Sequence, residues 1–331
     1  MSTDQYIHTR EEKEKNSKNT EGFKPQLVAI GIVSIGVVGG LLIATRFVDI
    51  SVTPKWSLQK ISAPTNVTTN TPPKVSTVDT TLLQQQVLPS SGVVLPITWK
   101  NLGKRMVADG VIDETKFRKI FSSGVTPEEE IMLTGDSTQL IVMNANNSRF
   151  LLDMLWAFGL ANKNEILEKG EMVDKQYGGA GNFASTGGWT LSQGKAMDHY
   201  SKHAYVTLNP QQQALVDRVS LTIYRPCCNN STHFPDCNHG MAMLGLLELM
   251  ASQNVSEAEM YKIALAVNSY WFPQTYLDLA SYFQEQGQKW SDVDPKTVLG
   301  FEYSSAQGYQ QTRAKIQSLP KPATGGGGCG T

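Results

Sequence analysis

Hydrophobic residues are distributed unevenly along the chain, and one run of them is apolar on every side. Residues 27–44 read LVAIGIVSIGVVGGLLIA and hold no charged side chain. At about 1.5 Å per helical residue the run spans roughly 27 Å, close to the hydrocarbon thickness of a bilayer. It exceeds the apolar core of a secretory signal, usually about 7–15 residues, and no A-x-A pattern follows it. We therefore predict one transmembrane helix over residues 25–47, with the lipid bilayer as its partner.

Basic residues on the two sides of this run predict its orientation. Because cytoplasmic flanks carry the excess of Lys and Arg, we expect the N-terminus in the cytoplasm and the following domain outside it. Gly36 and Gly40 form a GxxxG spacing, which allows self-association of such helices. Five basic residues precede the run and three follow it: Arg10, Lys13, Lys15, Lys18 and Lys24, then Arg46, Lys55 and Lys60.

Helical signals dominate the chain beyond residue 92. Thr126-Pro127-Glu128-Glu129 reads as a capping box, and Ser256 and Asn209-Pro210 open further apolar-periodic segments. Residues 149–161 and 239–252 are so apolar that we expect buried helices. Strand signals are weak, the best being 139–143 and 205–208. The pattern predicts a mainly α fold: a single helical extracytoplasmic domain behind one N-terminal transmembrane helix.

Changes in composition predict where the parts of the chain begin and end. The glycine-rich stretch 177–189, YGGAGNFASTGGW, is long for a loop, and we expect it to pack its backbone tightly or to cover a site. Polar and low-complexity segments flank the domain. The predicted parts are a cytoplasmic disordered tail (1–24), the transmembrane helix (25–47), a Thr/Pro/Ser-rich linker (48–91), the helical domain (92–319) and a flexible Gly-rich tail (320–331).

The charge balance limits the classes of partner. The formal net charge is -1, and basic residues form no stripe interleaved with aromatics. Nucleic-acid binding domains normally carry such a stripe. We therefore expect no nucleic acid among the partners, and the sequence names no protein partner.

The four cysteines are the main candidate for chemistry. None precedes Cys227; Cys228 and Cys237 follow within eleven residues, and Cys329 lies in the glycine-rich tail. Thiolate and imidazole are the usual protein ligands of zinc and copper. The segment connects two predicted helices, and Cys237 lies near the start of the second, where the helix dipole favours a thiolate. We predict a zinc or copper site formed by Cys227, Cys228, Cys237 and His239.

Other interpretations of the cysteines stay open at this stage. An extracytoplasmic compartment is oxidising, so Cys227 or Cys228 can pair with Cys237 in a disulfide that staples a structural or interaction domain. Thiol–disulfide exchange is a further alternative, although the usual C-x-x-C motif is absent. Buried, inert thiols are the remaining one. The sequence does not decide whether the protein is an enzyme.

Several residues are weaker ligand candidates. Met243 follows His239 by four residues, a spacing that shares a helix face. His199 and His203 have the spacing of a zinc-binding H-E-x-x-H helix, but Tyr200 replaces the glutamate, which excludes that protease class. His233 lies inside the cysteine segment, and Cys329 is a candidate mobile ligand.

The cysteine segment also carries a resemblance. RPCCNNSTHFPDCNHGMAMLGLLELM, residues 225–250, resembles a group of bacterial membrane-anchored proteins with a PCC…FPDCNHG signature. It is more distantly similar to proteins with a PCYCGCG motif, whose repeated cysteine–glycine it lacks. The resemblance covers residues 224–260. It implies a metal or thiol role and no particular reaction.

Overall fold

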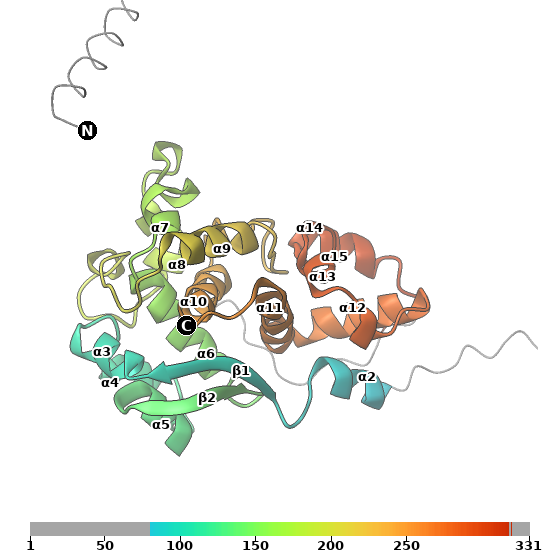
Figure 1. Ribbon diagram of the computed structural model, residues 1–331, viewed down its shortest axis with the longest axis horizontal. Helices are drawn as coiled ribbons and strands as arrows, with labels where there is room; N and C mark the ends of the chain where they lie inside the picture. The colour runs from blue at the N-terminus through green and yellow to red at the C-terminus, as the bar shows by residue number, and fades with distance from the viewer. Residues whose placement is uncertain (1–79, 318, 320–331) are drawn as a thin grey trace, which may run out of the picture. The chain divides into compact units, whose positions relative to one another are not determined.

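Two buried helices cross at the centre of the fold. The structure is a computed structural model that describes residues 80–317 and 319. In α6 (Ser148–Ala161) every residue except Arg149 is buried, and in α10 (Asn238–Ser252) every residue except the last is buried. The two helices pack mainly against each other (Figure 1). The described part is mainly helical, as predicted, and the apolar runs 149–161 and 239–252 are the buried helices expected.

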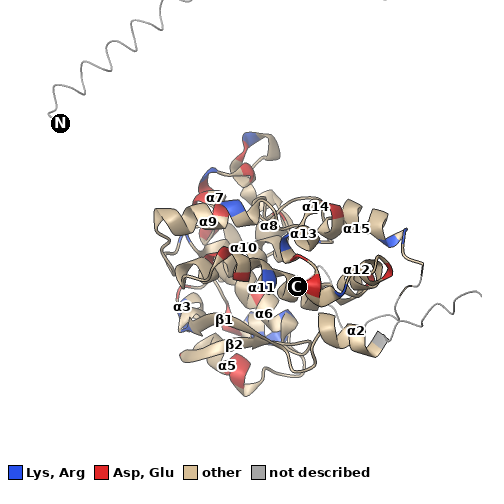
Figure 2. Cartoon of the chain, turned by 45° about the vertical axis from the view of Figure 1, so that its right-hand side comes forward, with Lys and Arg blue, Asp and Glu red and all other residues tan. Residues whose placement is uncertain are grey.

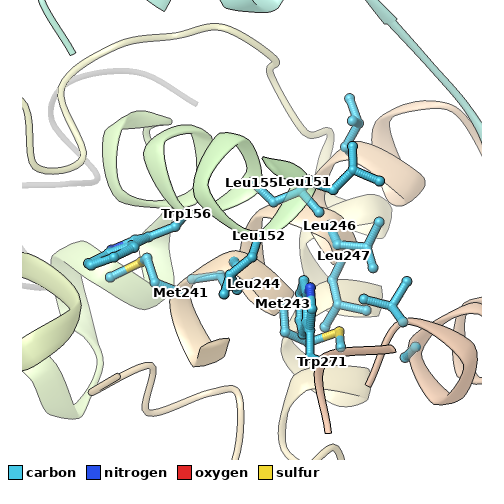
Figure 3. Packing of buried hydrophobic residues seen from close by; sticks show 14 of the residues in the cluster. Leu151, Leu152, Leu155, Trp156, Met241, Met243, Leu244, Leu246, Leu247 and Trp271 are labelled. Atoms are coloured by element: carbon cyan, nitrogen blue, oxygen red, sulfur yellow. The ribbon is translucent and has the colours of Figure 1, made fainter. Parts of the chain in front are cut away.

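Glycines allow α6 and α10 to approach closely. A Cβ atom on Gly159 would lie 2.2 Å from the carbonyl oxygen of Met241, and one on Gly245 would lie 2.7 Å from that of Leu155. Around this crossing, large side chains fill the space between the helices: Figure 3 shows Trp156 beside Met241 and Leu152 beside Leu244. The crossing fixes the direction of α10 and therefore the position of its first turn.

A two-stranded antiparallel sheet lies on one side of the central helices. β1 (Val93–Lys100) pairs with β2 (Ser137–Met143), and Leu95, Ile97 and Trp99 point into the core. The register is irregular after Leu95, where Pro96 has no N–H to donate. The connection between the strands holds three helices: α3 (Leu102–Ala108), α4 (Glu114–Lys119) and α5 (Pro127–Thr134). The capping box predicted at Thr126 opens α5 with both of its hydrogen bonds present.

The remaining helices surround the central pair. Asn209 and Ser256 cap α9 and α11, as predicted. Figure 2 shows that acidic and basic residues are interspersed over many of these elements. The elements are α7 (Glu165–Lys169), α8 (Ala184–Gly187), α9 (Pro210–Ser220), α11 (Glu257–Trp271), α12 (Pro273–Glu285), α13 (Pro295–Leu299), α14 (Phe301–Ser304) and α15 (Ala306–Arg313), with short 3₁₀ turns at Glu171–Val173, Lys175–Tyr177, Ala180–Asn182, Ala196–Asp198 and Trp290–Asp292.

Besides β1, which was not among the predicted strands, two features of the chain differ from the sequence prediction. Residues 205–208 form no strand; the backbone N–H of Val206 instead donates to the Asn162 side chain. α2 (Thr80–Val87) lies within the predicted linker 48–91, and its Leu83 and Val87 are buried. Folded structure therefore extends to the N-terminal side of residue 92.

The predicted membrane segment lies outside the described residues. Between residues 80 and 317, no helix combines the length and the apolar character that a bilayer crossing requires. The tail 1–24, the span 25–47 with Gly36 and Gly40, and the tail 320–331 with Cys329 all belong to the part of the chain that is not described.

A buried carboxyl group in α6 makes stability depend on pH. Asp153 is 3% exposed, and burial raises the pKa of its carboxyl to about 7, although the positive charge of Arg149 acts to lower that pKa. The folded state therefore holds a proton that the unfolded state releases above pH 3.8, so stability falls as pH rises from about 4 to 7. At about 1.4 kcal/mol for each pH unit, the loss is on the order of 4 kcal/mol.

Asp153→Asn is expected to remove this loss. Urea unfolding of both proteins at pH 5 and pH 8 measures it: the variant should gain stability relative to the parent on going from pH 5 to pH 8. Buried Glu248 also has a raised pKa because of its burial, but it is present in both proteins and cancels in the comparison. An equal difference between the two proteins at both pH values would contradict the prediction.

Candidate metal centre

The three cysteines of the described chain lie in one loop between α9 and α10. This segment, residues 221–237, is called the Cys loop below. It is held near its start and at its middle: Tyr224 N–H donates to the Leu299 carbonyl at 2.8 Å, and Ala306 N–H donates to the Cys228 carbonyl at 2.9 Å. The loop therefore rests against α13, α14 and α15, and the helix-loop-helix position predicted for it is confirmed.

A buried arginine organises the Cys loop. Arg225 is 1% exposed, and its guanidinium donates to the carbonyl oxygens of Asn230 at 2.9 Å and Phe234 at 3.0 Å. It also forms an ion pair with Asp236 at 2.5 Å, and its Nε donates to Cys237 Sγ at 3.1 Å. Burial lowers the pKa of Arg225, but its interactions with Cys237, Cys228 and Asp236 outweigh burial and hold that pKa above its ordinary value. The loop is thus folded around one permanent positive charge.

The three cysteine sulfur atoms converge beside this charge. Cys227 Sγ lies 3.4 Å from Cys237 Sγ, and the ligand atoms of Cys227, Cys228 and Cys237 all lie within 4.8 Å of one another. A separation of 3.4 Å is far longer than a disulfide bond of about 2.05 Å, so the pair is not covalently joined. All three residues are half-buried. The predicted cysteine cluster is therefore present and close enough to bind a metal ion.

Cys237 has the most electropositive surroundings of the three. Its sulfur caps α10, accepting the Gly240 N–H at 3.4 Å. Hydrogen bonds from Cys227 and Cys228, together with the charge and the Nε–H of Arg225, hold the pKa of Cys237 well below its ordinary value despite burial. A hydrogen bond with Cys227 lowers the pKa of Cys228, but its interactions with Cys237 and its burial raise that pKa to about 11. Cys237 is thus the cysteine of the cluster whose surroundings most favour the thiolate form, as the predicted helix-start position also does.

His239 is not part of the group. Its ring is fully buried, 4.4 Å from the ring centre of Phe272 and 5.7 Å from that of Trp271. Neither ring nitrogen has a hydrogen-bond partner within the described chain. Residues two apart on a helix point to nearly opposite sides, so the ring lies away from Cys237. The sequence spacing alone did not reveal this.

The weaker ligand candidates also lie outside the sulfur group. His233 Nδ1 pairs with Glu171 at 3.0 Å, and Met243 is buried in the core near Trp271 (Figure 3). His199 and His203 contact each other through ring nitrogens 3.2 Å apart, but in a turn segment and not on a helix.

The glycine-rich stretch 177–189 packs against the Cys loop. Ser185 N–H donates to the Asp236 carbonyl at 3.1 Å. Tyr177 and Phe183 form an aromatic cluster with Phe234 of the loop, with ring centres 5.3 to 5.4 Å apart. The stretch expected to pack its backbone tightly or to cover a site therefore contacts the second half of the Cys loop, at Phe234 and Asp236.

Sequence reasoning missed two residues that shape the site. They are Arg225 and Gly240, which the sequence analysis does not single out. A Cβ atom on Gly240 would lie 2.5 Å from Arg225 Cζ, so glycine makes room for the guanidinium. An arginine in the loop that leads into the strongly apolar helix α10 was the available signal, since a buried charge is normally paired.

The geometry of the sulfur group fits a thiophilic ion. Zn–S bonds of about 2.3 Å place two sulfurs about 3.8 Å apart in tetrahedral geometry and about 4.0 Å apart in trigonal geometry. The observed separations, 3.4 Å for one pair and at most 4.8 Å for the others, bracket these values. Soft thiolate ligands select zinc, Cu(I) or iron–sulfur centres over magnesium and calcium.

Comparison with known proteins adds no further assignment. The chain matches no protein-family profile, no curated protein and no solved structure. The candidate function therefore rests on the residues of the site.

Proposed function

We propose that this protein is a membrane-anchored, extracytoplasmic metal-binding protein that handles or senses a thiophilic ion, zinc or Cu(I). The ligands are the sulfurs of Cys227, Cys228 and Cys237. The observation that carries the proposal is the convergence of these three sulfur atoms to within 4.8 Å. The apolar run 27–44 supports the membrane anchor, and the basic residues before it support the orientation.

A three-sulfur set favours exchange of the ion over permanent retention. Structural zinc sites are almost always closed by four protein ligands, whereas a site with three keeps one position for an incoming group. Among the described residues, no further His, Cys, Asp or Glu joins the sulfur group. The three cysteines are half-buried, so each residue keeps some contact with solvent.

Arg225 suits the charge of such a complex. Three thiolates with a monovalent or a divalent ion carry net negative charge, which is costly in a partly buried site. The guanidinium lies against Cys237 and offsets part of this charge. It also holds the loop in shape before any ion arrives, which reduces the ordering cost of binding.

Metal content of the purified full-length chain in detergent tests the proposal. After anaerobic loading with Zn²⁺ or Cu⁺ under reducing conditions and removal of unbound ion, we expect about one ion per chain, because clustered thiolates bind such ions strongly. The triple variant Cys227→Ser/Cys228→Ser/Cys237→Ser should hold none, and Cys329→Ser should behave as the parent. Less than about a tenth of an ion per chain, or equal loading of parent and triple variant, would overturn the proposal.

A further inference from the structure

The three cysteines of the cluster are not equivalent. Cys227 and Cys237 form a close pair, with sulfur atoms 3.4 Å apart. Cys228 contacts other residues of the Cys loop: its thiol donates to Asn230 O at 3.9 Å and to Asp236 Oδ1 at 3.8 Å. Cys228 also interacts with Cys227 and Cys237, but it alone has these further partners in the loop. A metal ion would use all three sulfurs alike, so the close Cys227–Cys237 pair points to a second chemistry.

Cys237 is placed to react first. Arg225 Nε–H and Gly240 N–H both point at its sulfur, at 3.1 and 3.4 Å, and both stabilise negative charge there. Reactive cysteines are typically found in such partly exposed, electropositive surroundings. The planar guanidinium is fixed by its other hydrogen bonds, so this environment does not depend on a bound ion.

Cys227 is placed to react second. Its sulfur needs to move by little more than 1 Å to reach the bonding distance of about 2.05 Å from Cys237 Sγ. Both residues lie in the same loop, one at its middle and one at its junction with α10, so closure moves loop backbone and not a helix. Cys228 stays engaged with Asn230 and Asp236.

We propose that Cys237 and Cys227 are also a redox pair that reduces a disulfide by thiol–disulfide exchange. The Cys237 thiolate attacks one sulfur of the external disulfide, which forms a mixed disulfide and releases the other sulfur as a thiolate. Cys227 then gives its proton to solvent and attacks Cys237 Sγ. This step forms the Cys227–Cys237 disulfide and releases the remaining external sulfur as a thiolate. Two electrons pass from the cysteine pair to the external disulfide.

Oxidation of the pair would also control the metal site. A Cys227–Cys237 disulfide removes two of the three thiolate ligands and leaves Cys228 alone. This second consequence rests on the proposed function, whereas the exchange reaction itself does not. Reduction of the disulfide restores the three-sulfur set.

Oxidised glutathione serves as the probe. The full-length chain carrying Cys329→Ser, free of metal, is equilibrated in glutathione buffers of increasing oxidised fraction. Remaining thiols are then alkylated and located by peptide mass mapping. We expect a Cys227–Cys237 disulfide with Cys228 alkylated.

Two matched single variants separate the roles. In the same background, Cys228→Ser should form the disulfide as readily as the parent but should bind metal about 10²–10³-fold more weakly. Cys227→Ser should form no disulfide and should accumulate glutathione attached to Cys237.

A disulfide that includes Cys228, or glutathione attached to Cys228 in preference to Cys237, would overturn the inference. Metal binding by the reduced parent without any disulfide formation would also overturn it while leaving the proposed function intact. Disulfide formation without metal binding would support the redox pair and overturn the proposed function.

Discussion

Replacing Cys237 by serine is expected to weaken metal binding by about 10²–10³-fold. Apparent binding free energies of structural zinc sites are about 10–16 kcal/mol, or roughly 2.5–4 kcal/mol for each of four ligands. Cys237 contributes one of three sulfurs, and within the described chain no fourth ligand of the group compensates for its loss. The loss should therefore be at least that of one ligand.

Serine is the informative replacement because it retains the structural role of Cys237. The cysteine sulfur caps α10 by accepting the Gly240 N–H, and serine is among the preferred N-cap residues. Its hydroxyl can also accept from Arg225 Nε. The fold should therefore persist while a soft ligand becomes a hard one, so a lower affinity reports on metal ligation.

Competition against a chromogenic zinc chelator of known affinity measures the effect. Cys228→Ser should show a loss of similar size, because both sulfurs belong to the same group. Cys329→Ser is the control and should keep the affinity of the parent. An affinity within about threefold of the parent for Cys237→Ser, with unchanged helical content, would show that Cys237 is not a ligand.

Helix ends were predictable because their signals are local. The capping residues Thr126, Asn209 and Ser256 lie where the sequence places them. Each needs only hydrogen bonds within its own first turn, so a few neighbouring residues determine the outcome. The apolar helices α6 and α10 were predictable for a related reason. They carry so few polar side chains that burial is the favourable environment for them.

Strands depended on contacts distant in sequence. β1 was not predicted, since Pro96 within it lacks an N–H and argues against a strand, and its partner β2 follows only after three helices. Residues 205–208 read like a strand, but the ring of Tyr205 stacks on His203 and lies beneath Arg105. At Tyr205 these side-chain contacts take the place of pairing with a neighbouring strand.

The site was predictable only in part for the same reason. Clustering in sequence identified Cys227, Cys228 and Cys237, because a short loop limits how far apart their sulfurs can be. It did not identify Arg225, whose partners at Asn230, Phe234 and Asp236 are set by the path of the loop in space. The arginine is a structural requirement of the loop, and this makes it the most sensitive position of the site.

Arg225→Met is expected to lower the free energy of unfolding by about 3–5 kcal/mol, because it leaves the buried partners of the guanidinium unpaired. The carbonyl oxygens of Asn230 and Phe234 lose their donor, and the Asp236 carboxylate loses its ion pair. Arg225→Lys should recover little, since one ammonium group cannot replace a planar fork that bonds in several directions.

Urea unfolding of metal-free, reduced protein measures this effect without a contribution from bound ion. Gly240→Ala is an independent variant with the same target: its Cβ would lie within 2.7 Å of three guanidinium atoms, so it should displace the guanidinium and destabilise the protein in the same direction. A loss of less than about 1 kcal/mol for Arg225→Met would contradict the structural role assigned to the guanidinium.

The double variant Arg225→Met/Asp236→Asn separates the cost of an unpaired charge from that of a disrupted loop. When both partners of an ion pair are removed, no buried charge is left without a counter-charge. The double variant should therefore lose about 1–3 kcal/mol less unfolding free energy than the two single variants lose in total. The remaining loss belongs to the two loop carbonyls, which no substitution at Asp236 can satisfy. Additive effects would mean that Asp236, which Asn230 also contacts at 2.9 Å, does not depend on the guanidinium.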